Sequence, residues 1–185
     1  MQKIVFNGHY LMYFDTAMAA YWRALAMPYH ETMHALHGDL YVRKATLEYL
    51  GSARYDEQLE VGMRCSRIGN SSIVFEAAAF RGEACLVHGE LVYVFADPAT
   101  QRSQPVPPAL RELLLGFEAG QDLVDVQRGN WATLGAAARA IRQTVFVDEQ
   151  QIPAELVCDA ADAGAVHAVA FNRLGMAVAA GRAVD

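Results

Sequence analysis

The chain has 185 residues, of which 54% are hydrophobic and 19% are charged. This composition excludes a disordered or low-complexity protein and leaves room for one or two folded domains. The formal net charge of −6 argues against a nucleic-acid binder, because phosphate contacts need clustered basic residues.

The first residues lack the apolar core and cleavage site of a signal peptide, and no apolar run reaches the roughly 20 residues of a membrane span. The three cysteines are widely spaced and show neither a disulfide framework nor metal-binding spacing. We therefore expect a cytoplasmic protein without a membrane span.

The first predicted element is a helix from about Gly8 to Ala26. Its apolar residues recur at the 3,4 spacing of one helix face: Leu11, Phe14, Met18, Tyr21, Trp22 and Leu25. Alanines widen this face, so we expect the helix to be largely enclosed by other elements. Asn7 is expected to be the N-cap, because its side chain can accept a hydrogen bond from a free backbone N–H.

Strand patterns follow the helix. Apolar residues alternate with polar ones over 59–66, and longer apolar segments cover 73–80 and 85–95, with turn residues between them. Residues 40–50 form a plausible fourth strand, and a short helix is predicted over 109–117. One apolar helix followed by an antiparallel meander indicates an α+β fold with a curved sheet wrapped around that helix.

A second pattern begins after a connector around 119–122. A short strand is predicted over 123–126 and a helix over 131–147. Two strand patterns, 167–171 and 176–180, flank a turn sequence and predict a hairpin.

Two stretches of the first segment carry a family resemblance. Residues 4–15 (IVFNGHYLMYFD) resemble the helix start of hot-dog-fold acyl-CoA thioesterases of the 4-hydroxybenzoyl-CoA type. Residues 47–59 and 68–72 are similar to later segments of that family, in the same order. The resemblance covers about residues 1–118 and implies a hot-dog fold, a homodimer or homotetramer, and an acyl-CoA site at the subunit interface. It implies a coenzyme A thioester as substrate or ligand and no further cofactor.

The resemblance also bears on catalysis. Thioester hydrolysis needs a carboxylate and donors aimed at the developing oxyanion. The backbone amides around Asn7, Gly8 and His9 can form such a donor cradle at the helix start. The family's first strand and catalytic Asp would fall before Met1, so we expect weak or no hydrolysis. Asp15 is a further catalytic candidate, but it lies roughly 12 Å along the helix from Asn7, and a structural role is the simpler interpretation.

Arg43 and Arg67 are candidates for binding the CoA phosphates, although a solvated strand face is the commoner explanation for such residues. Ser71 and Ser72 are candidate CoA contacts through the family resemblance alone, and a turn is the simpler interpretation. His30 and His34 have helical spacing, but the absence of further ligands nearby argues against a metal site.

The second segment resembles the opening of a GNAT-family N-acetyltransferase. The resemblance lies in residues 129–153, in Asp159 and Asp162, in 167–170 and in 175–182. It implies a partial GNAT domain over 126–185, joined by a linker over 119–125. The family's Gly-rich pyrophosphate loop is not found in the segment, so acetyl transfer is the least expected activity. Thioester hydrolysis and non-catalytic acyl-CoA binding or oligomerisation remain open alternatives.

Overall fold

The computed structural model describes residues 3–184. The chain divides into two compact units, Met1–Gln121 (unit 1) and Asp122–Asp185 (unit 2). Each unit has its own sheet.

Unit 1 contains helices α1 (His9–Ala24), α2 (Tyr29–Ala35) and α3 (Pro108–Glu118), and strands β1 (Asp39–Tyr49), β2 (Glu60–Ile68), β3 (Ser72–Arg81) and β4 (Ala84–Ala96). The predicted helix at the start, the four predicted strands and the predicted short helix are all present, with ends within a few residues of the expected ones. Helix α2 was not predicted, because its seven residues are too short to show a helical period.

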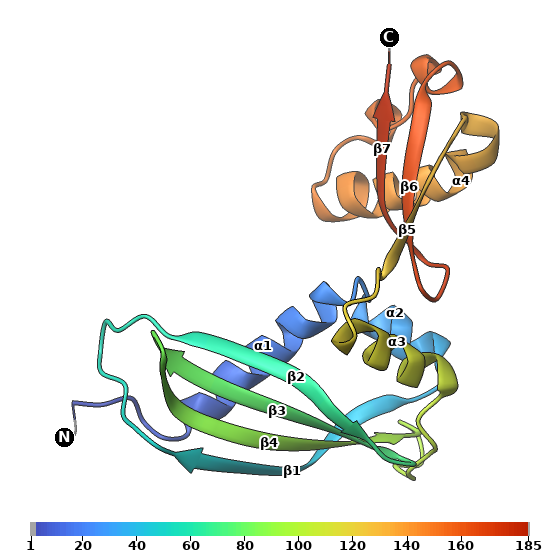
Figure 1. The fold of residues 1–185 in the computed structure, drawn as a ribbon. Coiled ribbons are helices and arrows are strands. Elements are labelled where there is room, and N and C mark those ends of the chain that lie inside the picture. Colours follow the sequence, from blue (N-terminus) through green and yellow to red (C-terminus); the bar gives the residue numbers. More distant parts are fainter. Residues whose placement is uncertain (1–2, 185) are drawn as a thin grey trace. The chain divides into compact units, whose positions relative to one another are not determined.

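The sheet of unit 1 is antiparallel with strand order β1-β4-β3-β2. Strands β2, β3 and β4 follow one another as hairpins, whereas β1 pairs with β4, so β1 and β2 form the two edges. Helix α1 lies across one face of this sheet (Figure 1). A Cβ atom on Gly89 of β4 would lie 2.7 Å from the Phe14 ring, so the glycine allows the close approach of helix and sheet.

Helix α1 is less enclosed than predicted. The face that carries Tyr10, Phe14, Met18, Tyr21 and Trp22 is buried, but the helix covers the sheet from one side only. Leu11, expected on the buried face, is 43% exposed, and Met12 is 62% exposed. The prediction of an enclosed helix was therefore wrong for its outer half.

The predicted N-cap was also wrong by one residue. Gly8 occupies the N-cap position of α1, and no side chain caps the first turn. The Asn7 side-chain oxygen instead accepts from the N–H of the next residue, Gly8, at 3.1 Å. Asn7 lies in the turn that precedes the helix, which places its side chain one residue too early to cap it.

Helix α3 is joined to both α1 and the sheet edge by one carboxylate. The Tyr21 hydroxyl donates to Glu118 Oε1 at 2.5 Å, and the backbone N–H of Cys65 donates to the same oxygen at 2.7 Å. The carboxylate therefore satisfies a backbone donor on the outer edge of β2 that would otherwise lack a partner.

Unit 2 contains strand β5 (Val124–Gly129), helix α4 (Trp131–Arg142), strands β6 (Val166–Asn172) and β7 (Ala177–Ala183), and a π-helical turn over Gln143–Glu149 that continues α4. Two short 3₁₀ turns, Ala154–Leu156 and Ala160–Ala163, complete it. The predicted strand, helix and hairpin are confirmed. The antiparallel order is β5-β6-β7, and Leu134 and Ala138 of α4 pack on Val169 of β6.

A buried ion pair supports unit 2. Arg142 Nη1 lies 2.8 Å from Asp162 Oδ1, and both side chains are more than nine-tenths buried. The Arg182 guanidinium from β7 lies 2.7 Å from the same carboxylate oxygen. This cluster joins α4, the 3₁₀ turn and the last strand.

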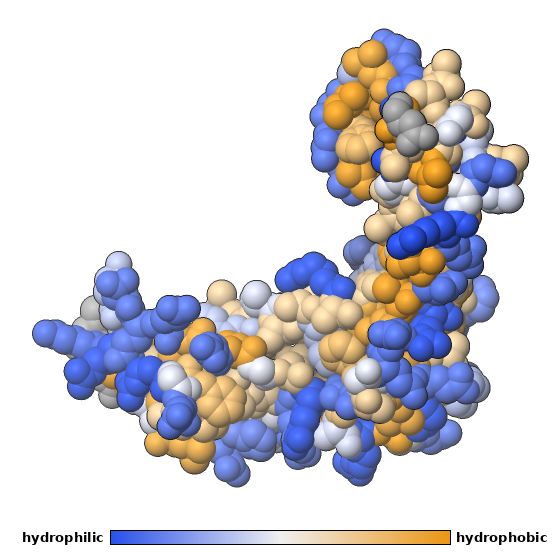
Figure 2. All heavy atoms as spheres, turned by 45° about the horizontal axis from the view of Figure 1, so that its top comes forward, coloured by the Kyte–Doolittle hydropathy of each residue, from blue (hydrophilic) through white to orange (hydrophobic). Residues whose placement is uncertain are grey.

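Apolar and hydrophilic side chains are interspersed on the surface of both units (Figure 2). In unit 1 the exposed apolar residues include Phe6, Tyr49, Leu50 and Tyr55, which are between 49% and 95% exposed. No helix among residues 3–184 is long and apolar enough to cross a bilayer.

Candidate functional site

The start of α1 brings three of the candidate residues together. Asn7, Gly8 and His9 are consecutive and at least partly exposed. The Gly8 N–H donates to Asn7 Oδ1 at 3.1 Å, and the His9 N–H donates to the Phe6 carbonyl at 2.9 Å. A ligand oxygen that binds the Gly8 N–H must therefore replace the Asn7 side-chain oxygen, which is exposed and can rotate away.

Helix geometry places Asp15 away from these residues. Six residues of helix separate it from His9, which corresponds to a rotation of roughly 240° about the axis. Asp15 is exposed and lies close enough to Tyr93 for its charge to add to burial in raising the pKa of that phenol. The structure does not bring Asp15 to the helix start.

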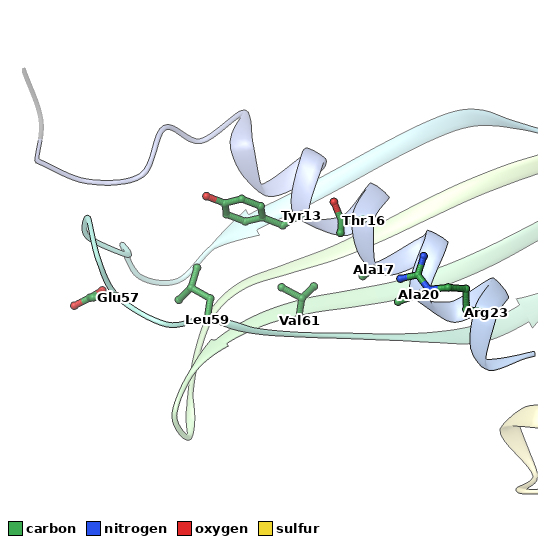
Figure 3. A pocket seen from close by; sticks show the side chains of 8 residues that line it. All are labelled: Tyr13, Thr16, Ala17, Ala20, Arg23, Glu57, Leu59 and Val61. Atoms are coloured by element: carbon green, nitrogen blue, oxygen red, sulfur yellow. The ribbon is translucent and has the colours of Figure 1, made fainter. Parts of the chain in front are cut away.

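A groove runs beside α1. It has a volume of about 440 Å³ and lies between the helix and the segment that enters β2. Its lining consists of Tyr13, Thr16, Ala17, Ala20, Arg23, Glu57, Leu59 and Val61 (Figure 3). Tyr13 is four residues after His9, so the groove follows the helix stripe that begins at the candidate site.

Glu57 is a carboxylate in this groove that the sequence patterns did not single out. Its Oε2 accepts from the backbone N–H of Arg54 at 2.8 Å, and Arg81 Nη1 lies 3.0 Å from the same oxygen. These hydrogen bonds lower the pKa of Glu57. A loop without periodicity carries the residue, so only the packing of the loop near α1 reveals its place.

The four candidate CoA-binding residues are spread over the sheet. Ser72 pairs with Val94 of β4, whereas Tyr49, whose hydroxyl donates to the Asn7 carbonyl, pairs with Val87. Val87 and Val94 are seven residues apart on β4, a distance of roughly 23 Å along the strand. Ser71 adjoins Ser72 in the turn at the far end of the sheet from Asn7.

Arg43 and Arg67 are both exposed, Arg43 on edge strand β1 and Arg67 on the opposite edge strand, β2. One copy of the chain therefore does not assemble these arginines and serines around the start of α1. Within residues 3–184, no three His, Cys, Asp or Glu side chains are grouped to hold a metal ion.

Comparison with known proteins finds similarity to a thioesterase family over part of unit 1. Residues 2–88 match the model described as "Thioesterase superfamily". Acyl-CoA thioester hydrolase YbgC of Escherichia coli O157:H7 is 25% identical over 111 residues, which cover 58% of this chain and 80% of that protein.

Solved structures are similar over the same region. The PA5185 protein from Pseudomonas aeruginosa strain PAO1 is 26% identical with a TM-score of 0.52, covering 62% of this chain and 79% of that one. A thioesterase from Thermus thermophilus, complexed with coenzyme A and Zn, is 23% identical with a TM-score of 0.54, covering 63% and 83%. The antiparallel sheet with its helix in unit 1 is consistent with the hot-dog thioesterase fold that the sequence resemblance implied.

Proposed function

We propose that unit 1, whose residues 2–88 match the thioesterase superfamily model, hydrolyses acyl-CoA thioesters. The observation that carries the proposal is the exposed start of α1 at the head of a groove. A related protein is named an acyl-CoA thioester hydrolase, and a solved neighbour holds coenzyme A, which supports a CoA thioester as the ligand. No further cofactor is part of this proposal.

In this proposal the thioester carbonyl oxygen binds at the start of α1. The Gly8 N–H exchanges the Asn7 side-chain oxygen for the carbonyl oxygen of the substrate. As water adds to the carbonyl carbon, negative charge develops on that oxygen, and the N–H together with the positive end of the helix stabilises it. The carbon–sulfur bond then breaks, releasing the carboxylic acid and the thiol of CoA.

Binding of acyl-CoA without hydrolysis is a second candidate function. The carboxylates of Asp15 and Glu57 are the two candidates for the base that takes the proton from water. Asp15 lies on another side of the helix, and the pKa of Glu57 is lowered by its hydrogen bonds to Arg54 and Arg81, which makes it a weak base. With neither carboxylate well suited to act as the base, we expect slow thioester hydrolysis.

Substitution of Gly8 tests the proposed carbonyl site. Gly8 has φ −65°, a value that proline adopts, and Gly8→Pro removes the N–H. We expect Gly8→Pro to lower kcat roughly 100-fold, the loss typical of an oxyanion donor. The matched control, Gly8→Ala, keeps the N–H, and its methyl group meets only the exposed Phe6 ring, which can move.

The assay follows free thiol release from a panel of acyl-CoAs. Calorimetry with the same compounds separates hydrolysis from binding alone. Equal rates for the Gly8→Pro and Gly8→Ala variants would contradict the role of this N–H. Thiol release by neither the wild type nor the variants, with CoA binding retained, would favour the non-catalytic function.

We further propose that two or four copies of the chain assemble to complete the CoA site. Strand β1 is an edge strand, and its residues from Val42 to Thr46 are exposed. Pairing at this edge would join the sheets of two copies. The CoA contacts proposed at Arg43, Arg67, Ser71 and Ser72 would then come from more than one protomer.

For unit 2 we propose the opening part of a GNAT-like domain. Strand β5, helix α4 and the β6–β7 hairpin follow one another in an antiparallel sheet, which agrees with the order expected from the resemblance. Titration of the chain with acetyl-CoA, followed by amide NMR shifts in residues 122–184, tests this proposal. Shifts confined to unit 1 would contradict a CoA-binding role for unit 2.

A further inference from the structure

The groove along α1 has a distinct charge at each end. At the end near the helix start, Glu57 carries a carboxylate that is paired with Arg81. At the other end Arg23 is the one cationic residue of the lining. Figure 3 shows the Arg23 side chain turned back along the helix toward Ala20, the direction that helix geometry favours for long side chains.

Between these ends the lining of the groove includes small and aliphatic side chains. Ala17 and Ala20 form the helix side, and Leu59 and Val61 form the opposite side. Small and aliphatic side chains suit a hydrocarbon chain, and a volume of about 440 Å³ lies within the range of small-ligand sites, roughly 300–1,000 Å³.

Arg23 is not committed to a partner within the protein. Among residues 3–184, no ion pair or hydrogen bond joins its guanidinium to an acidic side chain. An exposed arginine that lines a partly apolar groove is free to form a bidentate pair with a carboxylate that arrives with a ligand.

We propose that Arg23 binds a carboxylate at the far end of the substrate's acyl chain, so that the preferred substrates are ω-carboxyacyl-CoAs. This inference rests on the proposed thioester hydrolysis. With the thioester carbonyl at the Gly8 N–H, the acyl chain follows the groove over Ala17 and Ala20 and ends at the guanidinium.

The length of the helix sets the length of the acyl chain. Eleven residues separate His9 from Ala20, a distance of roughly 16 Å at 1.5 Å per residue. An extended hydrocarbon advances about 1.3 Å per carbon, the projection of a C–C bond of about 1.5 Å. A chain of about twelve carbons therefore spans the groove, whereas a chain of six does not reach Arg23.

Pairs of substrates that differ only at the chain end test the inference. We expect the KM of dodecanedioyl-CoA to be three- to tenfold lower than that of dodecanoyl-CoA, which corresponds to a partly exposed ion pair. Hexanedioyl-CoA and hexanoyl-CoA should have equal KM values. Arg23→Met should abolish the preference within the long pair, and Arg23→Lys should retain part of it.

The matched control is Arg102→Met, which removes an exposed arginine outside the groove and should leave the preference unchanged. Equal KM values for the two long substrates with the wild-type protein would overturn the inference and leave hydrolysis intact. An equal rise in KM for both long substrates in Arg23→Met would also overturn it, because Arg23 would then contact a CoA phosphate.

If the wild type releases no thiol from any substrate, hydrolysis fails as the function. Calorimetric Kd values for dodecanedioyl-CoA and dodecanoyl-CoA then replace KM in the same comparison. A preference for the dicarboxylic chain that is lost in Arg23→Met would support the carboxylate site in a protein that only binds. Equal affinity or no binding would overturn it.

Discussion

Asp162 shows how a single buried charge depends on its neighbours. Burial alone would raise the pKa of its carboxyl, but hydrogen bonds from Arg142 and Arg182 lower it from 3.8 to about 2. Because the pKa is lower in the folded state than in the unfolded one, the pair stabilises unit 2 above about pH 4. This contribution disappears as the pH falls from about 4 to 2.

We expect Asp162→Asn to destabilise unit 2 by about 3 kcal/mol at pH 7, because it leaves the buried Arg142 without its counter-charge. When the pH is lowered from 5 to 2, the free energy of unfolding of unit 2 should fall by about 2 kcal/mol less in the variant than in the wild type. Hydrogen exchange read by mass spectrometry over β6 and α4 measures both effects. Asp125→Asn, at an exposed position on β5, is the control. Equal protection from hydrogen exchange in Asp162→Asn and Asp125→Asn would contradict the stabilising role of the Asp162 carboxylate.

Individual positions were harder to predict from the sequence than elements. Leu11 fits the apolar period of the first helix yet is exposed, because the sheet covers only one side of α1. Asn7 is a good capping residue, but the turn before the helix places Gly8 at the cap instead. The groove could not be predicted, since Glu57 and Leu59 meet α1 only through the path of the loop that carries them.

At the level of elements, the packing of α1 against β4 depends on Gly89. A Cβ atom there would lie 2.7 Å from the Phe14 ring and 3.4 Å from the Thr46 carbonyl. We expect Gly89→Ala to lower the free energy of unfolding of unit 1 by about 1–3 kcal/mol, because Phe14 is fully buried and cannot move aside.

Gly62→Ala on β2 is the control for this experiment, since a Cβ atom at Gly62 has no neighbour within 4 Å. Urea unfolding followed by circular dichroism compares the two variants. If Gly62→Ala were as destabilising as Gly89→Ala, the loss would come from the strand backbone and not from contact with Phe14.

The elements themselves follow from the sequence because their periods are local. Alternation in β2 and β4 and the 3,4 spacing in α1 and α4 need no distant contact to be recognised. The order β1-β4-β3-β2 is different, because the pairing of β1 with β4 joins strands separated by two others. The apolar helix and the meander pattern indicated a sheet around the first helix, and the family resemblance implied the same arrangement.

For the whole molecule, the proposed assembly makes a prediction about β1. If two copies of β1 pair antiparallel around Thr46, Lys44 of each copy lies opposite Glu48 of the other. We expect Lys44→Glu or Glu48→Lys alone to weaken the dimer about tenfold or more, because two like-charge pairs replace two favourable ones. The double variant should restore the affinity. Sedimentation equilibrium measures the dissociation constant.

An unchanged dissociation constant in both single variants would show that the interface does not lie at β1. A wild-type chain that sediments as a monomer at all concentrations would contradict the proposed assembly. The sequence could not test this proposal, because exposed edge charges such as Arg43 and Lys44 look the same on a solvated strand and on an interface.

The Glu118 carboxylate on the Cys65 amide has a consequence for solubility. The backbone N–H of Cys65 on the outer edge of β2 is occupied by Glu118, so it cannot donate to a foreign strand. A strand added to this edge could therefore pair only with the first five residues of β2, Glu60 to Arg64. The last four residues of this nine-residue strand are then closed to a foreign strand. One glutamate at the end of α3 thus acts as a gatekeeper against edge-to-edge aggregation.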